Sequence, residues 1–497
     1  MANEIELKLA FPPAARAAIL RHPLLANAKR IGRAQTLINT YFDTPEMALS
    51  ARRVALRTRK AGKLWLQTVK CAAESLGGLS SRPEWEQAFN GSFDFSAIDA
   101  PAPRRLLEKH AHRIVPLFTT NFRRETLLLT PREGVRIQVM IDSGEISANG
   151  RVEPISELEL ELETGCADDL LAIASELATS LPLLPYDPSK AARGYALFRN
   201  ESIKPARPAA PRLDLQAAPL QAFVGAAFQT ITAWAANQHA AIESDDPEFV
   251  HQLRLSLRRL RSLIRLFTPV LPADFVSHWQ AALAAEANSF AEARELSVLC
   301  TEVLDAASEG DSDQRLPALR SRAQSAAAAA TAAVKARLGA AGAGVVLLSL
   351  SRALHALPTQ TTQPALADLA TQALHAQHKH ACRCFAKAKA ERSAENLHAL
   401  RIALKRLRHA AETFAPIFPA KAHERALAEL GCRLSELGRL HDLAEALPRL
   451  ADWASEDPTL REAVAFVAGW HAATSLKLRR RILPRCAELL KQKHWRA

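Results

Sequence analysis

Glu4-Ile5-Glu6-Leu7-Lys8-Leu9, near the amino terminus, alternates charged and apolar side chains with a period of two. Successive side chains of a β-strand point to opposite faces, so this pattern predicts a strand with one charged face and one apolar face. The alternation returns in Glu157-Leu158-Glu159-Leu160-Glu161-Leu162-Glu163. Two such strands indicate a sheet that buries one face in a core and turns carboxylates and a lysine toward the other.

Other segments of the first 200 residues also have strand character. Period-two or β-branched patterns run through residues 54–59, 64–70 and 136–142, and Asn149-Gly150 is typical of a tight turn between paired strands. We therefore predict that the chain up to about Asn200 consists of strands connected by turns.

The composition changes after this region. Residues 204–219 are rich in Pro, Ala and Arg, which is typical of an extended linker. From residue 220 onward Ala, Leu, Arg and Glu dominate and apolar residues recur every three or four positions, which predicts helices, including the Ala-rich segment 325–333. We predict a strand-rich domain over 1–203, a linker over 204–219 and a helical domain over 220–497.

The helical region contains an internal repeat. The segment HQLRLSLRRLR that begins at His251 matches HALRIALKRLR that begins at His398, an offset of 147 residues. At the same offset FTPVLP (267–272) matches FAPIFP (414–419), and Arg294-Glu295-Leu296 corresponds to His441-Asp442-Leu443. Three ungapped matches at one offset indicate a duplication, with halves at about 220–365 and 366–497.

The overall charge bears on partners and location. Lys and Arg (64) exceed Asp and Glu (52) for a formal net charge of +12, which favours polyanionic partners. Aromatic residues make up 6%, and no basic run is interleaved with Phe or Tyr, which disfavours nucleic acid as the partner.

The amino terminus has carboxylates where a signal peptide needs positive charge, and the apolar stretch from Val345 to Leu350 is too short for a membrane span. Because the seven Cys residues form no disulfide framework either, we predict a cytoplasmic protein without a membrane partner.

The charged strand faces point to a class of ligand. If the strands close into a barrel, carboxylates line its lumen on some strands and guanidinium and ammonium groups on others. Carboxylate oxygens bind hard cations such as Mg²⁺ or Mn²⁺, while Arg and Lys bind phosphate oxygens. The alternative is a solvent-exposed charged face, which is the commoner role for one such strand on its own. Two acidic strands and several basic strands in one domain favour the lumen.

Short motifs follow one another in a defined order along the first 200 residues. They are Glu4-x-Glu6-x-Lys8, Tyr41-Phe42-Asp43-Thr44, Leu56-Arg57-Thr58-Arg59, Thr68-Val69-Lys70, Arg124-Glu125, Asp142-Ser143-Gly144, the 157–163 strand, and Ser189-Lys190-x-x-Arg193-Gly194-Tyr195. In this order they resemble the CYTH superfamily, the triphosphate tunnel metalloenzymes. The resemblance implies a closed antiparallel β-tunnel that binds a triphosphate together with a divalent metal.

The same resemblance implies the roles of individual residues. Those expected to hold the metal, Mg²⁺ or Mn²⁺, are Glu4, Glu6, Glu157, Glu159, Glu161 and Asp142. Among them Glu159 and Glu161 are favoured over Glu157, and Asp142 either assists a second metal or holds a basic residue. Those expected to bind the phosphates are Lys8, Arg57, Arg59, Lys70, Arg124, Lys190 and Arg193.

Basic residues form a stripe on the first repeated helix. They are spaced three and four apart, which places them on one helical face, and the second half repeats the pattern. A solvated basic face is the alternative, but the recurrence with the histidine retained weighs against it. These motifs resemble the CHAD domain, a helical duplication associated with polyphosphate binding, although Arg294-Glu295 departs from the Arg-Asp of that family. The resemblance implies that polyphosphate is bound by His251, Arg254, Arg258, Arg261, Arg294, His398, Arg401, Lys405, Arg408 and His441.

Together the motifs resemble those of bacterial CYTH–CHAD inorganic triphosphatases. This implies a multidomain α+β protein, with a metal-dependent domain that hydrolyses tripolyphosphate to pyrophosphate and phosphate and a duplicated helical bundle that binds inorganic polyphosphate. Two other functions stay open: a non-catalytic polyphosphate-binding module, and a CYTH adenylate cyclase or thiamine triphosphatase. The preferred metal and the oligomeric state are also open.

Overall fold

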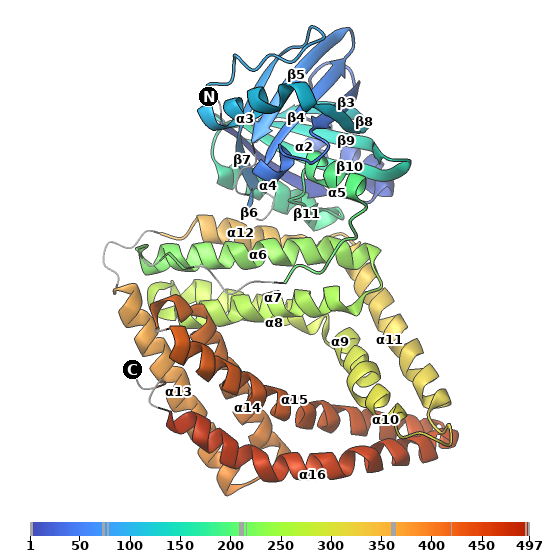
Figure 1. Cartoon of the computed structure of the whole chain (residues 1–497), viewed down its shortest axis with the longest axis vertical. Coiled ribbons are helices and arrows are strands. Elements are labelled where there is room, and N and C mark those ends of the chain that lie inside the picture. The colour runs from blue at the N-terminus through green and yellow to red at the C-terminus, as the bar shows by residue number, and fades with distance from the viewer. Residues whose placement is uncertain are drawn as a thin grey trace. The chain divides into compact units, whose positions relative to one another are not determined.

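A computed structural model of the chain describes residues 3–71, 75–76, 79–207, 213–214, 216–358, 364–418, 420–492 and 495, with the backbone alone at 3–4, 61, 75–76, 79–82 and 420. Part of the predicted linker, 208–212 and 215, therefore lies outside the described residues. The described chain divides into two compact units (Figure 1). Unit 1 comprises Met1–Ala206, Ile231–Glu243 and Arg337–Leu357, and unit 2 comprises Arg207–Thr230, Ser244–Ala336 and Pro358–Ala497.

Unit 1 is built on one antiparallel sheet. Its strands are β1 (Asn3–Ala10), β2 (Lys29–Arg30), β3 (Gln35–Asp43), β4 (Val54–Ala61), β5 (Leu64–Cys71), β6 (Ser75–Leu76), β7 (Leu79–Ala88), β8 (Val115–Leu129), β9 (Arg136–Ala148), β10 (Arg151–Thr164) and β11 (Leu184–Pro185). The five predicted strand segments all fall within these strands, at β1, β4, β5, β9 and β10. Asn149 and Gly150 connect β9 to β10 with φ of 50° and 75°, as a two-residue hairpin turn requires.

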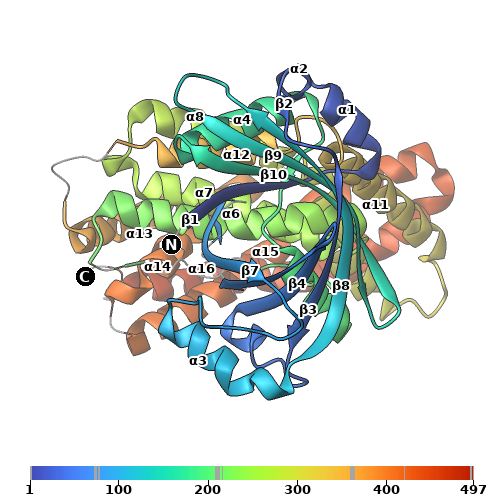
Figure 2. The same cartoon turned by 90° about the horizontal axis from the view of Figure 1, so that it is seen from above.

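The sheet closes on itself. Pairing runs in the order β1, β10, β9, β8, β3, β4, β5 and β7, and β7 pairs back onto β1. Figure 2 shows the sheet from one end, with β9 and β10 on one side and β4 and β7 on the other. The predicted closed antiparallel tunnel is confirmed.

The prediction of strands and turns alone was incomplete for this region. Helices α1 (Arg16–Arg21), α2 (Pro23–Ala26), α3 (Pro101–His110), α4 (Ala167–Ser180) and α5 (Lys190–Arg199) also belong to it. The apolar faces of β1 and β10 pack against α4, and Leu7, Leu9, Leu158 and Leu160 are fully buried there. This packing forces the opposite, charged faces of the same strands into the tunnel.

A helix from far along the chain completes unit 1. Helix α12 (Val345–His355) packs on α4, and Leu348 is fully buried in the same core. Arg352 donates from Nε and Nη2 to Asp168 at 2.8 and 3.1 Å. The segment before α12 approaches so closely that a Cβ on Gly344 would lie 2.2 Å from the carbonyl oxygen of Leu183.

The chain is helical from residue 219 to near its end, as predicted. The helices are α6 (Pro219–Glu243), α7 (Pro247–Leu266), α8 (Ala273–Asn288), α9 (Ala291–Val298), α10 (Asp305–Ser308), α11 (Pro317–Leu338), α12, α13 (Leu366–Ala390), α14 (Ala394–Thr413), α15 (Ala420–Glu456) and α16 (Arg461–Lys491). Helix α14 begins and ends 147 residues after α7, which is the offset of the sequence repeat. The equivalent residues Phe267 and Phe414 pack together, with ring centroids 5.5 Å apart.

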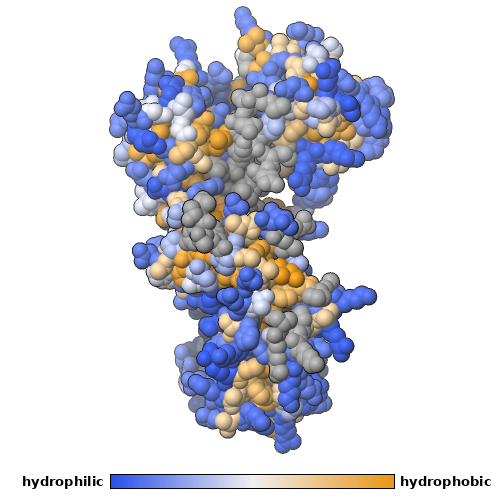
Figure 3. Space-filling model, turned by 90° about the vertical axis from the view of Figure 1, so that its left-hand side faces the viewer, coloured by the Kyte–Doolittle hydropathy of each residue, from blue (hydrophilic) through white to orange (hydrophobic). Residues whose placement is uncertain are grey.

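The surface is mostly hydrophilic on the face that Figure 3 shows, with smaller apolar areas between the polar ones. A search of the described residues finds no helix whose length and apolar content would let it cross a membrane. The predicted domain and repeat boundaries stay predictions. Each compact unit combines segments that are far apart in the sequence, so the units do not correspond to continuous domains.

Candidate functional site

Strand register brings the predicted charged residues of the tunnel next to one another. Lys8 on β1 lies opposite Glu159 on β10, and Glu157 on β10 lies opposite Asp142 on β9. Asp142 in turn lies opposite Arg124 on β8. Four neighbouring strands therefore turn charged side chains toward the lumen, with the two acidic strands β10 and β9 between the basic residues of β1 and β8.

Helix α5 brings a further cation to this wall. Its N-cap residue, Ser189, accepts a hydrogen bond from the Ala192 amide at 3.1 Å, and Lys190 is the first residue of the helix. The helix packs closely on β8, where a Cβ on Gly194 would lie 2.0 Å from the Phe118 ring. Gly194 is thus required for the close approach that delivers Lys190 to the tunnel.

The Lys190 ammonium lies at the centre of three carboxylates. Its Nζ is 2.8 Å from Asp142, 2.7 Å from Glu157 and 2.9 Å from Glu159. Burial alone would lower the pKa of Lys190, but these three carboxylates outweigh it and raise that pKa well above its usual value. Burial would likewise raise the pKa of Glu159, yet Lys190 and Arg124 hold it well below its usual range. Lys190 and Glu159 are therefore both ionised at neutral pH.

Arg124 makes the second set of ion pairs in this cluster. Its Nη2 is 2.6 Å from Asp142 and 2.5 Å from Glu159, and its Nε donates to Asp142 at 2.7 Å. The Phe122 ring lies beneath both Arg124 and Lys190, at 5.6 and 5.0 Å from ring centroid to cation. These contacts hold both cations in position on the wall of the tunnel.

The facing wall is built from β4, β5 and β7 and is also basic. Lys70 Nζ is 2.6 Å from Glu84, which also lies 3.6 Å from Arg57. Arg59 donates to Asn39 at 2.9 Å and lies 3.8 Å from Glu86. Burial, reinforced by the charges of Arg57 and Arg124, lowers the pKa of Arg59 to about 10. A guanidinium crowded in this way by other cations is stabilised when an anion binds beside it.

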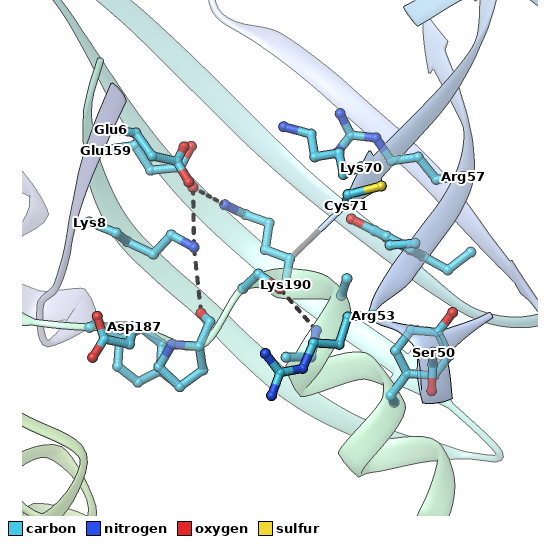
Figure 4. A pocket seen from close by; sticks show the side chains of 18 of the residues that line it. Glu6, Lys8, Ser50, Arg53, Arg57, Lys70, Cys71, Glu159, Asp187 and Lys190 are labelled. Carbon is cyan, nitrogen blue, oxygen red and sulfur yellow. Dashed lines mark hydrogen bonds and ion pairs between the residues drawn. The ribbon is translucent and has the colours of Figure 1, made fainter. Parts of the chain in front are cut away.

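A cavity of about 590 Å³ lies between these walls. Figure 4 shows Glu6, Lys8 and Glu159 on one side of it, with Arg57 and Lys70 across from them. In the described part of the chain eight basic and three acidic side chains line the cavity: Lys8, Arg53, Arg57, Arg59, Lys70, Arg124, Lys190 and Arg199 against Glu6, Glu159 and Asp187. The excess of positive charge suits a compact polyanion.

Some predicted tunnel residues lie beside or behind this cavity. Asp142 and Glu157 are fully buried behind it, where they hold Arg124 and Lys190. Arg193 is engaged by Glu153, Glu157 and the Pro154 carbonyl oxygen instead of facing the cavity. The side chain of Glu4 lies outside the described residues. The individual roles of these residues stay predictions.

Two arrangements of carboxylates bear on a metal ion. Among the described residues, one group of three metal-capable side chains converges, Asp142, Glu157 and Glu159, and the Lys190 ammonium already lies among them. Glu161 lies opposite Glu6 on the neighbouring strand, and no described residue forms an ion pair with it. Burial, followed by the charge of Glu6, raises the pKa of Glu161. A divalent cation fits this second position because the two carboxylates repel each other without it.

In unit 2 part of the predicted basic stripe converges from both halves of the repeat. Lys405 on α14 lies close enough to Arg258 and Arg254 on α7, and to Arg401, for their charges to act on it. Burial, followed by Arg258 and Arg401, lowers the pKa of Lys405 to about 7, against the opposing pull of Asp442. This cluster is therefore short of negative charge.

Histidines and one more arginine of the predicted set border the cluster. His398 and His441 lie side by side, with their Nδ1 atoms 3.1 Å apart. Burial and the charge of Arg294 lower the pKa of His251 to about 4, and burial and Arg401 do the same for His441. Both imidazoles are consequently neutral at pH 7, which leaves them able to accept a hydrogen bond or to donate one.

Two residues of the predicted stripe, Arg261 and Arg408, interact with residues other than those of the cluster around Lys405. Arg261 is influenced by Arg406, a residue the stripe did not include. Arg408 donates from Nε to Glu412 at 2.7 Å. The helical spacing predicts that these side chains share one face of each helix, but the packing of neighbouring helices decides which of them meet.

Several residues that line the tunnel cavity were missed by the sequence analysis, among them Arg53, Tyr186, Asp187 and Arg199. Arg53 had a detectable signal, because it is in phase with Arg57 and Arg59 on the strand that follows. The others come from the segment around α5, where no periodic pattern marks the cavity-facing side.

Comparison with known proteins agrees with this architecture. The CYTH domain model matches residues 2–195, and the CHAD domain model matches residues 225–451. An inorganic triphosphatase from Haemophilus influenzae is 31% identical over 217 residues, 40% of this chain and 55% of that protein, so the chain matches about half the length of this relative.

Two solved structures are similar to parts of this chain. The CHAD domain from the plant Ricinus communis is 28% identical and aligns over 59% of this chain and 99% of that one, with a TM-score of 0.52. A putative adenylyl cyclase from Hippeastrum, described as having a dominant triphosphatase activity, is 21% identical over 41% of this chain and 98% of that one, with a TM-score of 0.30. The two family models identify a CYTH domain over residues 2–195 of this chain and a CHAD domain over residues 225–451.

Proposed function

We propose that the CYTH domain hydrolyses inorganic tripolyphosphate to pyrophosphate and phosphate with Mg²⁺ or Mn²⁺. The observation that carries the proposal is the cavity of about 590 Å³, in which cations on β4, β5, β8 and α5 surround a space edged on one side by carboxylates. The matched part of the Haemophilus influenzae inorganic triphosphatase supports the same reaction class.

The metal is assigned to Glu6 and Glu161, with Glu159 beside them. Glu6 and Glu161 lie opposite each other across β1 and β10, and the raised pKa of Glu161 reflects burial and the nearby charge of Glu6. Both oxygens of Glu159 already contact Lys190 or Arg124, so its share in metal binding requires one of these cations to move toward substrate. A bound divalent cation would polarise a phosphoryl oxygen and neutralise charge in the transition state.

The basic residues orient the substrate and stabilise the charge that develops during hydrolysis. Arg57 and Arg59 form planar forks that match phosphate oxygens, while Lys8, Lys70 and Lys190 act as point charges. Attack of water on a terminal phosphorus breaks the bond to the bridging oxygen, and the negative charge passes to the departing pyrophosphate. A cation that a carboxylate already holds beside the cavity, such as Lys70 against Glu84, needs little reorganisation as this charge builds up, which lowers the barrier.

Phosphate release from tripolyphosphate in the presence of Mg²⁺ tests the assignment. Glu6→Ala should abolish turnover while unfolding remains close to that of the wild type, because Glu6 faces the cavity and not the core. Glu163→Gln is the matched control, since Glu163 lies on the same face of β10 but is exposed and bound by Arg136 and Gln138. Full activity in Glu6→Ala would reject the metal assignment, and parallel assays with ATP and thiamine triphosphate compare the alternative substrates.

We also propose that the CHAD domain binds inorganic polyphosphate. Support comes from the cluster of Arg254, Arg258, Arg401 and Lys405, in which burial and the charges of cations from both repeats lower the pKa of Lys405. A polyanion would supply the missing negative charge.

Binding of long-chain polyphosphate to the full chain tests this second proposal. The double variant Arg254→Ala/Arg401→Ala should lose affinity, and affinity of the wild type should fall steeply with salt, by analogy with counterion release from nucleic acid. The double variant Arg425→Ala/Arg461→Ala is the matched control, because it removes the same amount of charge from exposed positions elsewhere in unit 2. Equal affinity in the two double variants would count against the cluster.

A further inference from the structure

Arg53 has an unusual backbone conformation for its residue type. It follows the short 3-10 helix Ser50–Arg52, directly before β4, with φ of 57° and ψ of 35°. This is the left-handed region, where a side chain crowds the backbone and where glycine is the usual residue. A bulky arginine at such a position indicates that its side chain has a use there.

The segment before Arg53 is held rigidly. The carboxylate of Asp43 is fully buried and accepts hydrogen bonds from the amides of Thr44, Leu49 and Ser50, at 2.7 to 2.8 Å. Leu49 is also fully buried and accepts from the Val54 amide at 3.0 Å. Arg53 is therefore presented from a fixed turn, so little backbone entropy is lost when its side chain binds a ligand.

The Arg53 side chain extends into the tunnel cavity, as Figure 4 shows. It is exposed, and within the described part of the chain no carboxylate lies within ion-pair distance of it. The deeper cations differ, because Lys190, Arg124 and Lys70 each contact a carboxylate at 2.9 Å or less. Arg199, the other exposed arginine on the cavity lining, is paired with Glu201 at 2.7 Å. Arg53 thus adds a positive charge that no acidic group among the described residues pairs with.

We propose that Arg53 binds the outer phosphoryl group of an inorganic triphosphate and selects this substrate over ester triphosphates, an inference that rests on the proposed function. Each end of tripolyphosphate carries three non-bridging oxygens and up to two negative charges. In an ester triphosphate the corresponding phosphate has two non-bridging oxygens, one charge and an organic group. Both ends offer two oxygens to a guanidinium, so Arg53 discriminates between them by the larger negative charge of the free end and by the organic group that the ester carries.

Kinetics of Arg53→Gly with two substrates test the inference. In the full-length protein with Mg²⁺, KM for tripolyphosphate should rise by about five- to thirtyfold with little change in kcat, because one partly exposed charged hydrogen bond is lost. KM for ATP should change by less than about threefold. Glycine adopts the left-handed conformation without strain, so the melting temperature should stay the same or rise. Arg52→Gly is the matched control, since Arg52 is exposed and absent from the cavity lining, and it should leave both KM values unchanged.

The outcomes separate this inference from the proposed function. A wild-type protein inactive on tripolyphosphate would overturn the proposed function and the inference with it. An active wild type would overturn the inference alone if Arg53→Gly left KM for tripolyphosphate unchanged, or if KM for both substrates rose equally. A rise specific to tripolyphosphate, with the melting temperature maintained, supports the inference.

Discussion

Lys190→Met removes the one ammonium that three buried carboxylates share. Lys190 contacts Asp142, Glu157 and Glu159 at 2.7 to 2.9 Å, and the three acids are nearly or fully inaccessible to water. Removing one partner of a buried ion pair costs about 3–5 kcal/mol, because uncompensated charge is left in a poorly solvated site. For a unit of this size each kcal/mol lowers Tm by about 2–4 °C, so we expect a decrease of about 6–20 °C at pH 7.

The sign of the pH dependence makes this prediction specific. In the wild type, the opposing charges hold the pKa values of Glu157 and Glu159 below the usual range against burial, so their contribution to stability is present above pH 4.5 and is lost as the pH falls through their folded values. In Lys190→Met the ammonium is absent, so burial raises the pKa values of the neighbouring carboxyl groups with less opposition. One of these groups then takes up a proton in the folded state. Relative to the wild type, the free energy of unfolding of the variant should therefore recover by about 1.4 kcal/mol per pH unit for each proton taken up between pH 7 and pH 5.

Scanning calorimetry of both proteins at pH 7 and pH 5 measures the effect. Lys63→Met is the control, because Lys63 is exposed in the turn between β4 and β5, and it should unfold like the wild type at both values. If Lys190→Met matched the wild type at pH 7, or if the deficit stayed the same at pH 5, the shared ammonium would not be what stabilises the acidic cluster.

Three further predictions follow from other parts of the molecule. Glu161→Gln should raise the Mg²⁺ concentration for half-maximal tripolyphosphate hydrolysis by about tenfold or more, and an unchanged Mg²⁺ titration would remove Glu161 from the metal site. Polyphosphate affinity should fall as the pH rises from 6 to 8, because the pKa of Lys405 is about 7 and its charge is lost in this range; Lys405→Met should flatten the profile, and a wild-type-like slope in that variant would exclude Lys405 as the source. Gly344→Ala should destabilise unit 1 by about 1–3 kcal/mol, because its Cβ would meet a backbone oxygen at 2.2 Å. In contrast Gly225→Ala, with open space in helix α6, should be neutral or stabilising in the same thermal denaturation experiment, and equal effects of the two would contradict the close packing of α12.

Much of the architecture is encoded locally. Strict alternation in β1 and β10 fixes which side chains face the core, because a strand has a period of two whatever surrounds it. The same rule predicts that Glu6, Lys8, Glu157, Glu159 and Glu161 lie on the face of the sheet opposite the core. Helical periodicity and the repeat likewise predicted α7 and α14, whose bounds differ by the offset of the sequence match.

Tertiary structure alone decided which charges meet. No local pattern tells that Lys190 at the start of α5 lies among carboxylates from β9 and β10, since that contact depends on Gly194 letting the helix approach β8. Nor could the sequence separate Arg193, engaged behind the cavity by Glu157, from cations that face it. Helix α12, some 180 residues after α4, completes the core of unit 1 for the same reason. Periodicity sets the direction of a side chain relative to its own element, whereas the partner it finds is set by how distant elements pack.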